Sequence, residues 1–229
     1  MTRTVGGSVP KLFRGEWLTP NSPAYDSQRR VFNARFDRRP AIIARCAERA
    51  DVVAAVRFAR DNELPLTVRG GGMHMAGFAS IDAGLLLDLS LMRAVRVDAQ
   101  SRAAECGGGA LGGDLLVQAA SFGLAGVTGV LSKTDLAGLT LHGGVGYLSP
   151  RAGWACDNVL ALNVVTADGR SITVSSTEHP DLFWAMCGAG SSFGVTTSMT
   201  IRLHPIAGTI CTGTYVWPLS YTTVKTTFA

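Results

Sequence analysis

The chain has 229 residues, of which 47% are apolar and 17% are charged, and its formal net charge at pH 7 is +4. This composition excludes an intrinsically disordered chain and supplies enough apolar residues for one large domain or two small ones. The modest basic excess does not call for a nucleic-acid partner, and the 27 glycines lack a collagen-like period, so we expect them in tight loops.

The cysteines and the N-terminus limit the chemistry and the location. The five cysteines, Cys46, Cys106, Cys156, Cys187 and Cys211, are widely spaced and form neither a Cys-x-x-Cys pair nor a zinc-type cluster. We therefore expect reduced thiols and no metal site. No secretory signal and no membrane-spanning apolar run is visible, so we expect a soluble cytoplasmic protein without a membrane partner.

The first part of the chain predicts an arm followed by a β-α-β unit. Residues 1–39 are polar and weakly periodic, with one short helix expected near residues 25–33. From residue 40 we expect a strand at 41–46, a helix at 51–62 and a strand at 64–69. The unit ends on three consecutive glycines, 70–72.

Strands predominate in the rest of the chain. We expect strands at 85–89, 94–98 and 102–106, a helix at 113–121, and a hairpin of 160–166 with 171–175 around the Asp168-Gly169 turn. A helix at 181–186 and a strand at 195–203 follow. The pattern predicts an α+β fold with lobes at about 40–108 and 109–205, whose connecting loops can hold a ligand.

Two glycine-rich loops are candidates for binding phosphate. The loop from Arg69 to His74 directly follows a strand, and successive amides without side chains can converge there on a pyrophosphate; a simple tight turn is an equal alternative. The loop at 107–112 matches Gly-x-Gly-x-x-Gly. We reject a Rossmann fold for it, because no acidic residue lies at the ribose-binding spacing and the surrounding elements are mostly strands.

Seven segments, taken in order, carry a resemblance to a known family: RRPAIIARC, ADVVAAVRFAR, PLTVRGGG, LLLDLS, GLAGVTGVLSKTDLAGLTLHGGVGYLS, CDNVLALNVVTADGR and HPDLFWAMCGAGSSFGV. From about Tyr25 to Pro205 the chain resembles the PCMH-type FAD-binding domain of the vanillyl-alcohol-oxidase superfamily. It is most similar to the bacterial berberine-bridge-enzyme-like oxidoreductases. The resemblance implies a two-lobed FAD-binding domain at 40–205.

The resemblance also implies which residues contact FAD. In that family the loop corresponding to 68–77 wraps the pyrophosphate, segment 129–146 approaches the pyrophosphate and the isoalloxazine, and residues matching 163–165 and 193–195 border the adenosine. The implied contacts are Arg69, Gly70, Gly71, Gly72, Met73, His74, Gly77, Gly129, Ser132, Gly138, Gly143, Gly144, Gly146, Val165, Gly194 and Val195.

Several residues depart from the family pattern. Met73 stands where relatives commonly have the histidine that bonds to the flavin 8α-methyl, and Leu131 stands where some have a second attachment through cysteine. A thioether cannot form the histidyl bond, and His74 in an extended loop would point to the other side, so we expect noncovalent FAD. Asp135 and His142 replace small residues, and a carboxylate beside a pyrophosphate would be repulsive.

The last residues of the chain bear on whether it can act as an enzyme by itself. Relatives continue into a substrate-binding sheet, so we expect 206–229 to be the start of a truncated substrate domain. The resemblance implies hydride transfer from a C–H bond of a small-molecule substrate to flavin N5, with a base from outside this chain; the catalytic residues stay unknown. We expect the chain alone to be inactive. The alternatives are a silent FAD-binding fragment and a flavin subunit with a partner chain, and exposed apolar surface would favour self-association.

Overall fold

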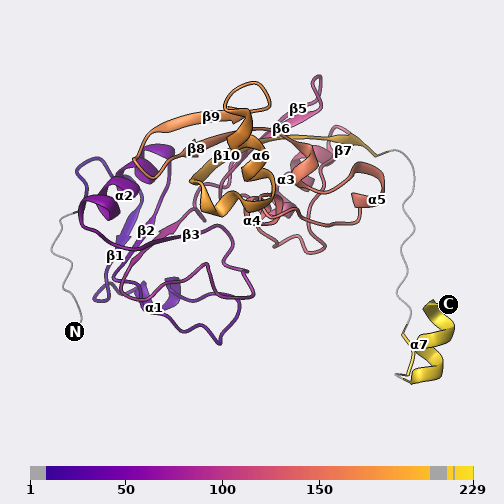
Figure 1. Cartoon of the computed structure of the whole chain (residues 1–229), viewed down its shortest axis with the longest axis horizontal. Helices are drawn as coiled ribbons and strands as arrows, with labels where there is room; N and C mark the ends of the chain where they lie inside the picture. Colours follow the sequence, from indigo (N-terminus) through magenta and orange to yellow (C-terminus); the bar gives the residue numbers. More distant parts are fainter. Residues whose placement is uncertain (1–8, 207–215, 219, 229) are drawn as a thin grey trace.

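Two sheets form the framework of the computed structural model, which describes residues 9–206, 216–218 and 220–228 (Figure 1). The first sheet has the order β1 (Glu16–Leu18), β2 (Ile42–Arg45), β4 (Leu85–Asp88) and β3 (Leu66–Arg69). Strands β2, β4 and β3 are parallel, and β1 runs antiparallel to β2. The second sheet is antiparallel, with the order β5 (Val95–Asp98), β6 (Ala103–Gly107), β10 (Val195–Arg202), β8 (Val159–Val165) and β9 (Ser171–Ser175). The predicted α+β class is confirmed.

Short helices and one small strand pair complete the described chain. The helices are α1 (Tyr25–Gln28), α2 (Arg49–Asp61), α3 (Gly112–Ala120), α4 (Leu136–Thr140), α5 (Ser149–Ala152), α6 (Pro180–Ala189) and α7 (Tyr221–Phe228), with the 3-10 turns η1 (Cys156–Asn158) and η2 (Gly190–Ser192). Strands β7 (Leu124–Ala125) and β11 (His204–Pro205) pair with each other. None of the helices in the described ranges is long and apolar enough to cross a membrane.

Helix α2 joins the two lobes through its apolar face. Val52, Ala55, Val56 and Ala59 recur at the spacing of one helical face and are all buried. They pack with residues of β2 and β4, and the same cluster includes Val165 from β8 and Val195 from β10. One hydrophobic core therefore crosses the boundary between the sheets, while a second core lies within the second lobe.

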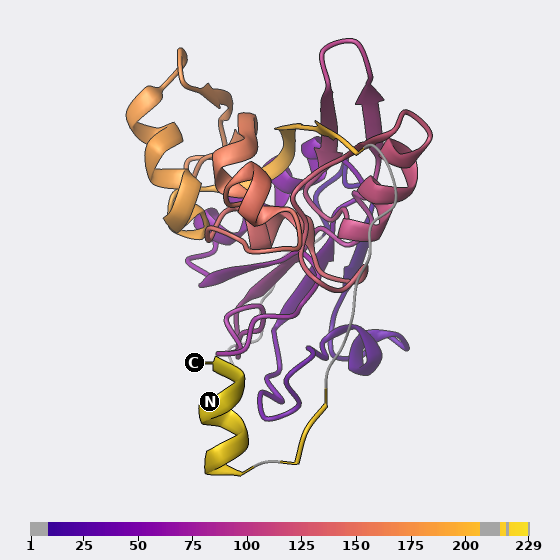
Figure 2. The ribbon, with the colours of Figure 1, turned by 90° about the vertical axis from the view of Figure 1, so that its right-hand side faces the viewer.

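Most of the strands and helices predicted from local patterns are present within a few residues of their expected bounds. The pairing differs from the expected organisation in two places. Strand β1 pairs with β2, so part of the expected N-terminal arm belongs to the first sheet. Strands β5 and β6 join the second sheet through β10, although the expected first lobe extended to residue 108, and in Figure 2 their hairpin projects away from the first sheet.

The end of the chain is only partly described. The residues at 208–218 have a strand-like sequence, but they fall largely on residues 207–215, outside the described ranges, as does Cys211. Helix α7 occupies a polar, Thr-rich segment whose sequence shows no recognisable packing pattern.

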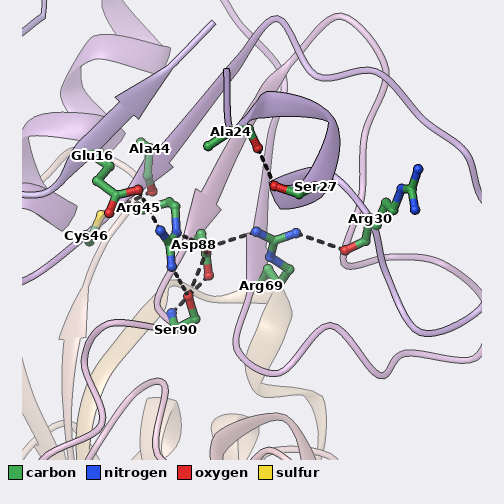
Figure 3. Close-up of polar contacts among 10 residues, drawn as sticks. All are labelled: Glu16, Ala24, Ser27, Arg30, Ala44, Arg45, Cys46, Arg69, Asp88 and Ser90. Carbon is green, nitrogen blue, oxygen red and sulfur yellow. Dashed lines mark hydrogen bonds and ion pairs between the residues drawn. The ribbon is translucent and has the colours of Figure 1, made fainter. Parts of the chain in front are cut away.

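An ionic cluster closes the carboxyl-terminal edge of the first sheet (Figure 3). Arg45, Asp88 and Arg69 end the three parallel strands and lie in register. The fully buried carboxylate of Asp88 accepts hydrogen bonds from Arg69 Nη2 at 2.8 Å and Arg45 Nε at 3.2 Å. Burial alone would raise the pKa of Asp88, but the adjacent guanidinium of Arg69 and the hydrogen bonds from Ser90 hold that pKa below its ordinary value.

The cluster predicts that two aspartates, each the last residue of a strand, contribute very differently to the free energy of unfolding. Replacing Asp88 with Ala leaves the buried Arg69 without its counter-charge, so we expect the free energy of unfolding to fall by about 3 to 5 kcal/mol. Replacing Asp98, the exposed last residue of β5, with Ala should cost about 1 kcal/mol or less. Urea unfolding followed by circular dichroism measures both, and equal losses would contradict a special role for the cluster.

Candidate functional site

A cavity of about 1110 Å³ is lined by residues of both lobes. Its lining includes one side of α2, strand β3, the triple-glycine loop, helix α4, and the facing ends of β8 and β10. Cavities that hold small molecules usually measure about 300 to 1,000 Å³. The size suits a ligand that is large for a small molecule and long enough to contact both lobes.

The triple-glycine loop forms one wall. It follows Arg69, which the ionic cluster fixes, and the backbone N–H of Phe32 in the N-terminal part of the chain donates to Gly72 O at 3.0 Å. Gly72 has φ +70°, a conformation that glycine adopts without strain. A side chain on Gly70 would begin 2.3 Å from Asp135 Oδ1, so only glycine allows this close packing.

Asp135 lies between this loop and helix α4. It is the N-cap of α4, and its Oδ2 accepts a hydrogen bond from the N–H of Gly138 at 3.0 Å. Oδ1 is buried and has no hydrogen-bond partner in the described part of the chain. Burial raises the pKa of Asp135 from 3.8 to about 6, against the opposing effects of nearby N–H groups and of His142.

The opposite wall comes from the ends of β8 and β10. Val165 to Ala167 and Ser192 to Thr196 line it. A side chain on Gly194, whose φ is +152°, would begin 2.6 Å from Val164 Cγ1, so the backbones approach closely here. The hydroxyl oxygen of Thr196 is buried and, like Asp135 Oδ1, lacks a hydrogen-bond partner among the described residues.

These two atoms are the only buried side-chain nitrogen or oxygen atoms without a partner in the described ranges, and both belong to residues that line the same cavity. Buried polar groups in folded proteins are almost always hydrogen-bonded. The cavity therefore fits a ligand that brings hydrogen-bonding groups to both walls.

Two histidines meet at the cavity. The rings of His74 and His142 lie 6.4 Å apart between centroids, and both residues line the cavity together with Met73. His74 Nδ1 accepts a hydrogen bond from the N–H of Ala76, while His142 Nδ1 lies 2.8 Å from Gly138 O. His74 and Met73 thus share the cavity, although an extended loop would have sent them to opposite sides.

The structure brings about half of the expected contact residues to this cavity. These are Gly70, Gly72, Met73, His74, Gly138, Val165, Gly194 and Val195. Arg69 and Gly71 instead line a smaller cavity of about 290 Å³, to which Gly70 and Gly72 also contribute. The remaining expected residues line neither of the two cavities: Gly77, Gly129, Ser132, Gly143, Gly144 and Gly146.

Three of those glycines instead pack closely against neighbouring residues that do not line the cavity. A side chain on Gly143 would begin 2.8 Å from the Trp154 ring, one on Gly144 would begin 2.8 Å from Ala155 Cβ, and one on Gly146 would begin 1.7 Å from Thr128 O. Thr196 is not among the residues expected to contact the cofactor, and no local pattern distinguishes it from its neighbours. No group of three or more metal-ligating side chains that could hold a metal ion is found in the described ranges.

The raised pKa of Asp135 predicts how the stability of the ligand-free protein depends on pH. Because the folded pKa of about 6 lies above the ordinary 3.8, the folded state binds this proton more tightly than the unfolded state. The contribution to stability is complete below pH 3.8 and is lost as the pH rises through 6. Between pH 5 and 8 the free energy of unfolding should fall by about 1 to 2 kcal/mol more in the parent than in an Asp135→Asn variant. Urea titrations at both pH values measure this, and parallel pH profiles would contradict it.

Known proteins are similar to this chain in sequence and in fold. A family model described as FAD binding domain matches residues 40–175. The chain is 41% identical over 210 residues to (R)-6-hydroxynicotine oxidase of Paenarthrobacter nicotinovorans, covering 92% of this chain and 46% of the relative. It thus spans about half the length of the curated relatives it matches.

Solved structures of oxidases also resemble this chain. A crystal structure of 6-hydroxy-D-nicotine oxidase from Arthrobacter nicotinovorans matches with a TM-score of 0.84 and 43% identity, over 86% of this chain and 44% of that one. Glucooligosaccharide oxidase from Acremonium strictum, described with 6-S-cysteinyl, 8α-N1-histidyl FAD, matches with a TM-score of 0.79 and 30% identity, over 83% of this chain and 41% of that one. The resemblance expected from the sequence is confirmed: the chain belongs to the FAD-binding domain family of FAD-linked oxidoreductases, in its PCMH-type, berberine-bridge-enzyme-like group.

Proposed function

We propose that the chain holds FAD in the 1110 Å³ cavity and serves as the flavin-binding part of an oxidoreductase that accepts a hydride from a small organic substrate. The single observation that carries the proposal is the position of the two partnerless polar atoms, on Asp135 and Thr196, in residues on opposite walls of one cavity. An extended dinucleotide has polar groups along its whole length and can reach both.

The two walls suit different parts of that ligand. Backbone amides of the loop at Gly70 to His74 can approach a pyrophosphate closely, because no side chains intervene at the glycines. The ends of β8 and β10 present apolar residues and the Thr196 hydroxyl, which suit an adenosine. We assign the pyrophosphate to the loop and the adenosine to the opposite wall.

The chemistry of the reaction is the cofactor's: FAD accepts the hydride from a substrate carbon when it is bound. The protein's part is to bind, orient and exclude water, and apolar residues such as Leu139, Leu141 and Phe78 line the cavity for this purpose. None of the described residues forms a paired-carboxylate or Ser-His-Asp arrangement at the cavity that would supply a base. We therefore expect this chain alone to turn over substrate slowly, if at all.

A second candidate is a flavin subunit that works against a partner chain or another copy. Its support is the exposure of large apolar side chains in one segment near α4 and α5: Val130 59%, Leu131 60%, Val145 59%, Tyr147 76% and Trp154 56%. Extensive exposed apolar surface is typical of interaction surfaces.

Two adjacent threonines on β10 test the assignment of the cavity. Thr196→Val removes the hydroxyl without a partner, so we expect FAD affinity to fall about tenfold, equivalent to about 1.4 kcal/mol, with the stability of the ligand-free protein unchanged or higher. Thr197 is equally buried, but its hydroxyl donates to Asn163 O at 3.1 Å. Thr197→Val should therefore cost about 1 kcal/mol of stability and leave FAD affinity unchanged.

Flavin fluorescence titrations and urea unfolding measure the two quantities. Failure of the parent to bind FAD would refute the proposed function. Unchanged FAD affinity in Thr196→Val would contradict the assignment of the adenosine to this wall.

We further propose that the bound FAD is noncovalent, because Met73 and Leu131 stand at the two attachment positions of the family. Acid precipitation of the flavin-loaded protein should release all of the yellow colour into the supernatant. Flavin retained in the pellet, located by mass spectrometry of the peptide that contains His74, would instead show attachment at this neighbouring histidine.

A further inference from the structure

We propose that Asp135 contacts the phosphates of bound FAD as a neutral carboxylic acid, so that binding of FAD takes up one proton from solvent. The inference rests on the proposed function and adds a residue that sets the cofactor's affinity as a function of pH. The proton joins one oxygen of the carboxylate, and no other bond is made or broken.

The geometry of the carboxyl group is the first argument. Oδ2 accepts the N–H of Gly138, whereas Oδ1 is buried beside the loop that we assign to the pyrophosphate and has no hydrogen-bond partner in the described ranges, although the N–H of Gly71 is near enough to stabilise the carboxylate. A side chain on Gly70 would begin 2.3 Å from Oδ1, and one on Gly71 would begin 2.5 Å from Asp135 Cβ. The carboxyl group of Asp135 therefore lies directly against the loop to which we assign the phosphates.

The charges around Asp135 are the second argument. The nearest guanidinium of the loop, that of Arg69, points into the ionic cluster and contacts Asp88 at 2.8 Å, so it is not available to neutralise Asp135. Arg93 is paired with Asp114 of α3 at 2.6 Å. Lys133, two residues before Asp135, is exposed to solvent.

The two cavity histidines complete the set of titratable groups. His142 follows α4 and favours the charged form of Asp135, while His74 lies on the loop side. His142 Nδ1 lies against Gly138 O, and His74 Nδ1 accepts the N–H of Ala76, so these two ring nitrogens face groups other than the Asp135 carboxyl. An ionised Asp135 would thus face the phosphates as a like charge that His142 and the nearby N–H groups offset only in part.

Protonation converts this repulsion into a hydrogen bond. The carboxylic acid can donate to a phosphate oxygen, which the carboxylate cannot do. Burial already raises the pKa of Asp135 to about 6, and a neighbouring anion raises such a pKa further. At neutral pH the ligand-free carboxyl is then mostly ionised and the FAD-bound one mostly protonated, so affinity must fall as the pH rises, by up to about tenfold per pH unit.

The experiment is a set of FAD fluorescence titrations from pH 5.5 to 8.5 on the full chain. We expect the dissociation constant of the parent to rise by about tenfold or more between pH 6 and pH 8, and that of Asp135→Asn to change by less than about threefold. Asp98→Asn is the matched control, because Asp98, the exposed last residue of β5, does not line the cavity and the variant should follow the parent.

Protonated histidines would produce the same sign of pH dependence, because histidine also changes charge in this range. His74→Gln and His142→Gln are therefore titrated in parallel and should keep the pH dependence of the parent. A pH dependence that persists in Asp135→Asn and disappears in either histidine variant would overturn the proposal.

Calorimetry of FAD binding in buffers of different ionisation enthalpy counts the protons directly and does not depend on any variant folding. We expect uptake approaching one proton per FAD near pH 7 in the parent and near zero in Asp135→Asn. FAD binding by the parent without proton uptake and with constant affinity would overturn this inference and leave the proposed function standing. Absence of FAD binding at every pH would overturn both.

Discussion

Asp88 ends β4, the middle one of the three parallel strands of the first sheet, with no exposure to solvent, so its charge must be neutralised from within the protein. Arg69 and Arg45 do this from the strands on either side, and Arg45 also reaches Glu16 of β1 at 2.6 Å. A single buried carboxylate thereby fixes the ends of three parallel strands and ties the N-terminal part of the chain to them. Such a pair is costly to break from one side, because the partner left behind stays buried and charged.

The start of the glycine loop is a consequence of this arrangement. Arg69 is the last residue of β3, so fixing its side chain fixes the point from which Gly70 departs. The loop then packs against Asp135 at distances that no residue with a side chain could occupy. The cavity wall is thus built from backbone whose position depends on charges outside the cavity.

Local sequence patterns predicted the β-α-β unit, the hairpin around Gly169 and the position of the glycine loop, because each depends on residues that are close in sequence. They did not predict that β6 pairs with β10 across almost a hundred residues, or that a three-residue strand near Glu16 would join the first sheet. Pairing over such distances depends on the packing of the whole chain and leaves no local pattern.

The same limit applies to the candidate site. The expected contact residues were mostly glycines, and the structure divides these between the cavity and tight packing elsewhere. Only the missing partner of its buried hydroxyl distinguishes Thr196 among the described residues, and no sequence pattern indicates it. Asp135, whose carboxylate departs from the family pattern, has its oxygen beside the loop where the cofactor is proposed to bind.

Val165 and Val195 belong both to the core that joins the lobes and to the lining of the cavity. A change that reshapes this end of the cavity to admit a different ligand also removes contacts that hold the lobes together. Mutational routes to a new cofactor preference here are therefore narrow, because a natural domain has only a few kcal/mol of stability to lose. Substitutions that change ligand preference should therefore accumulate at positions that line the cavity but do not belong to the core between the lobes. Ala167 and Phe193, which are exposed, are such positions.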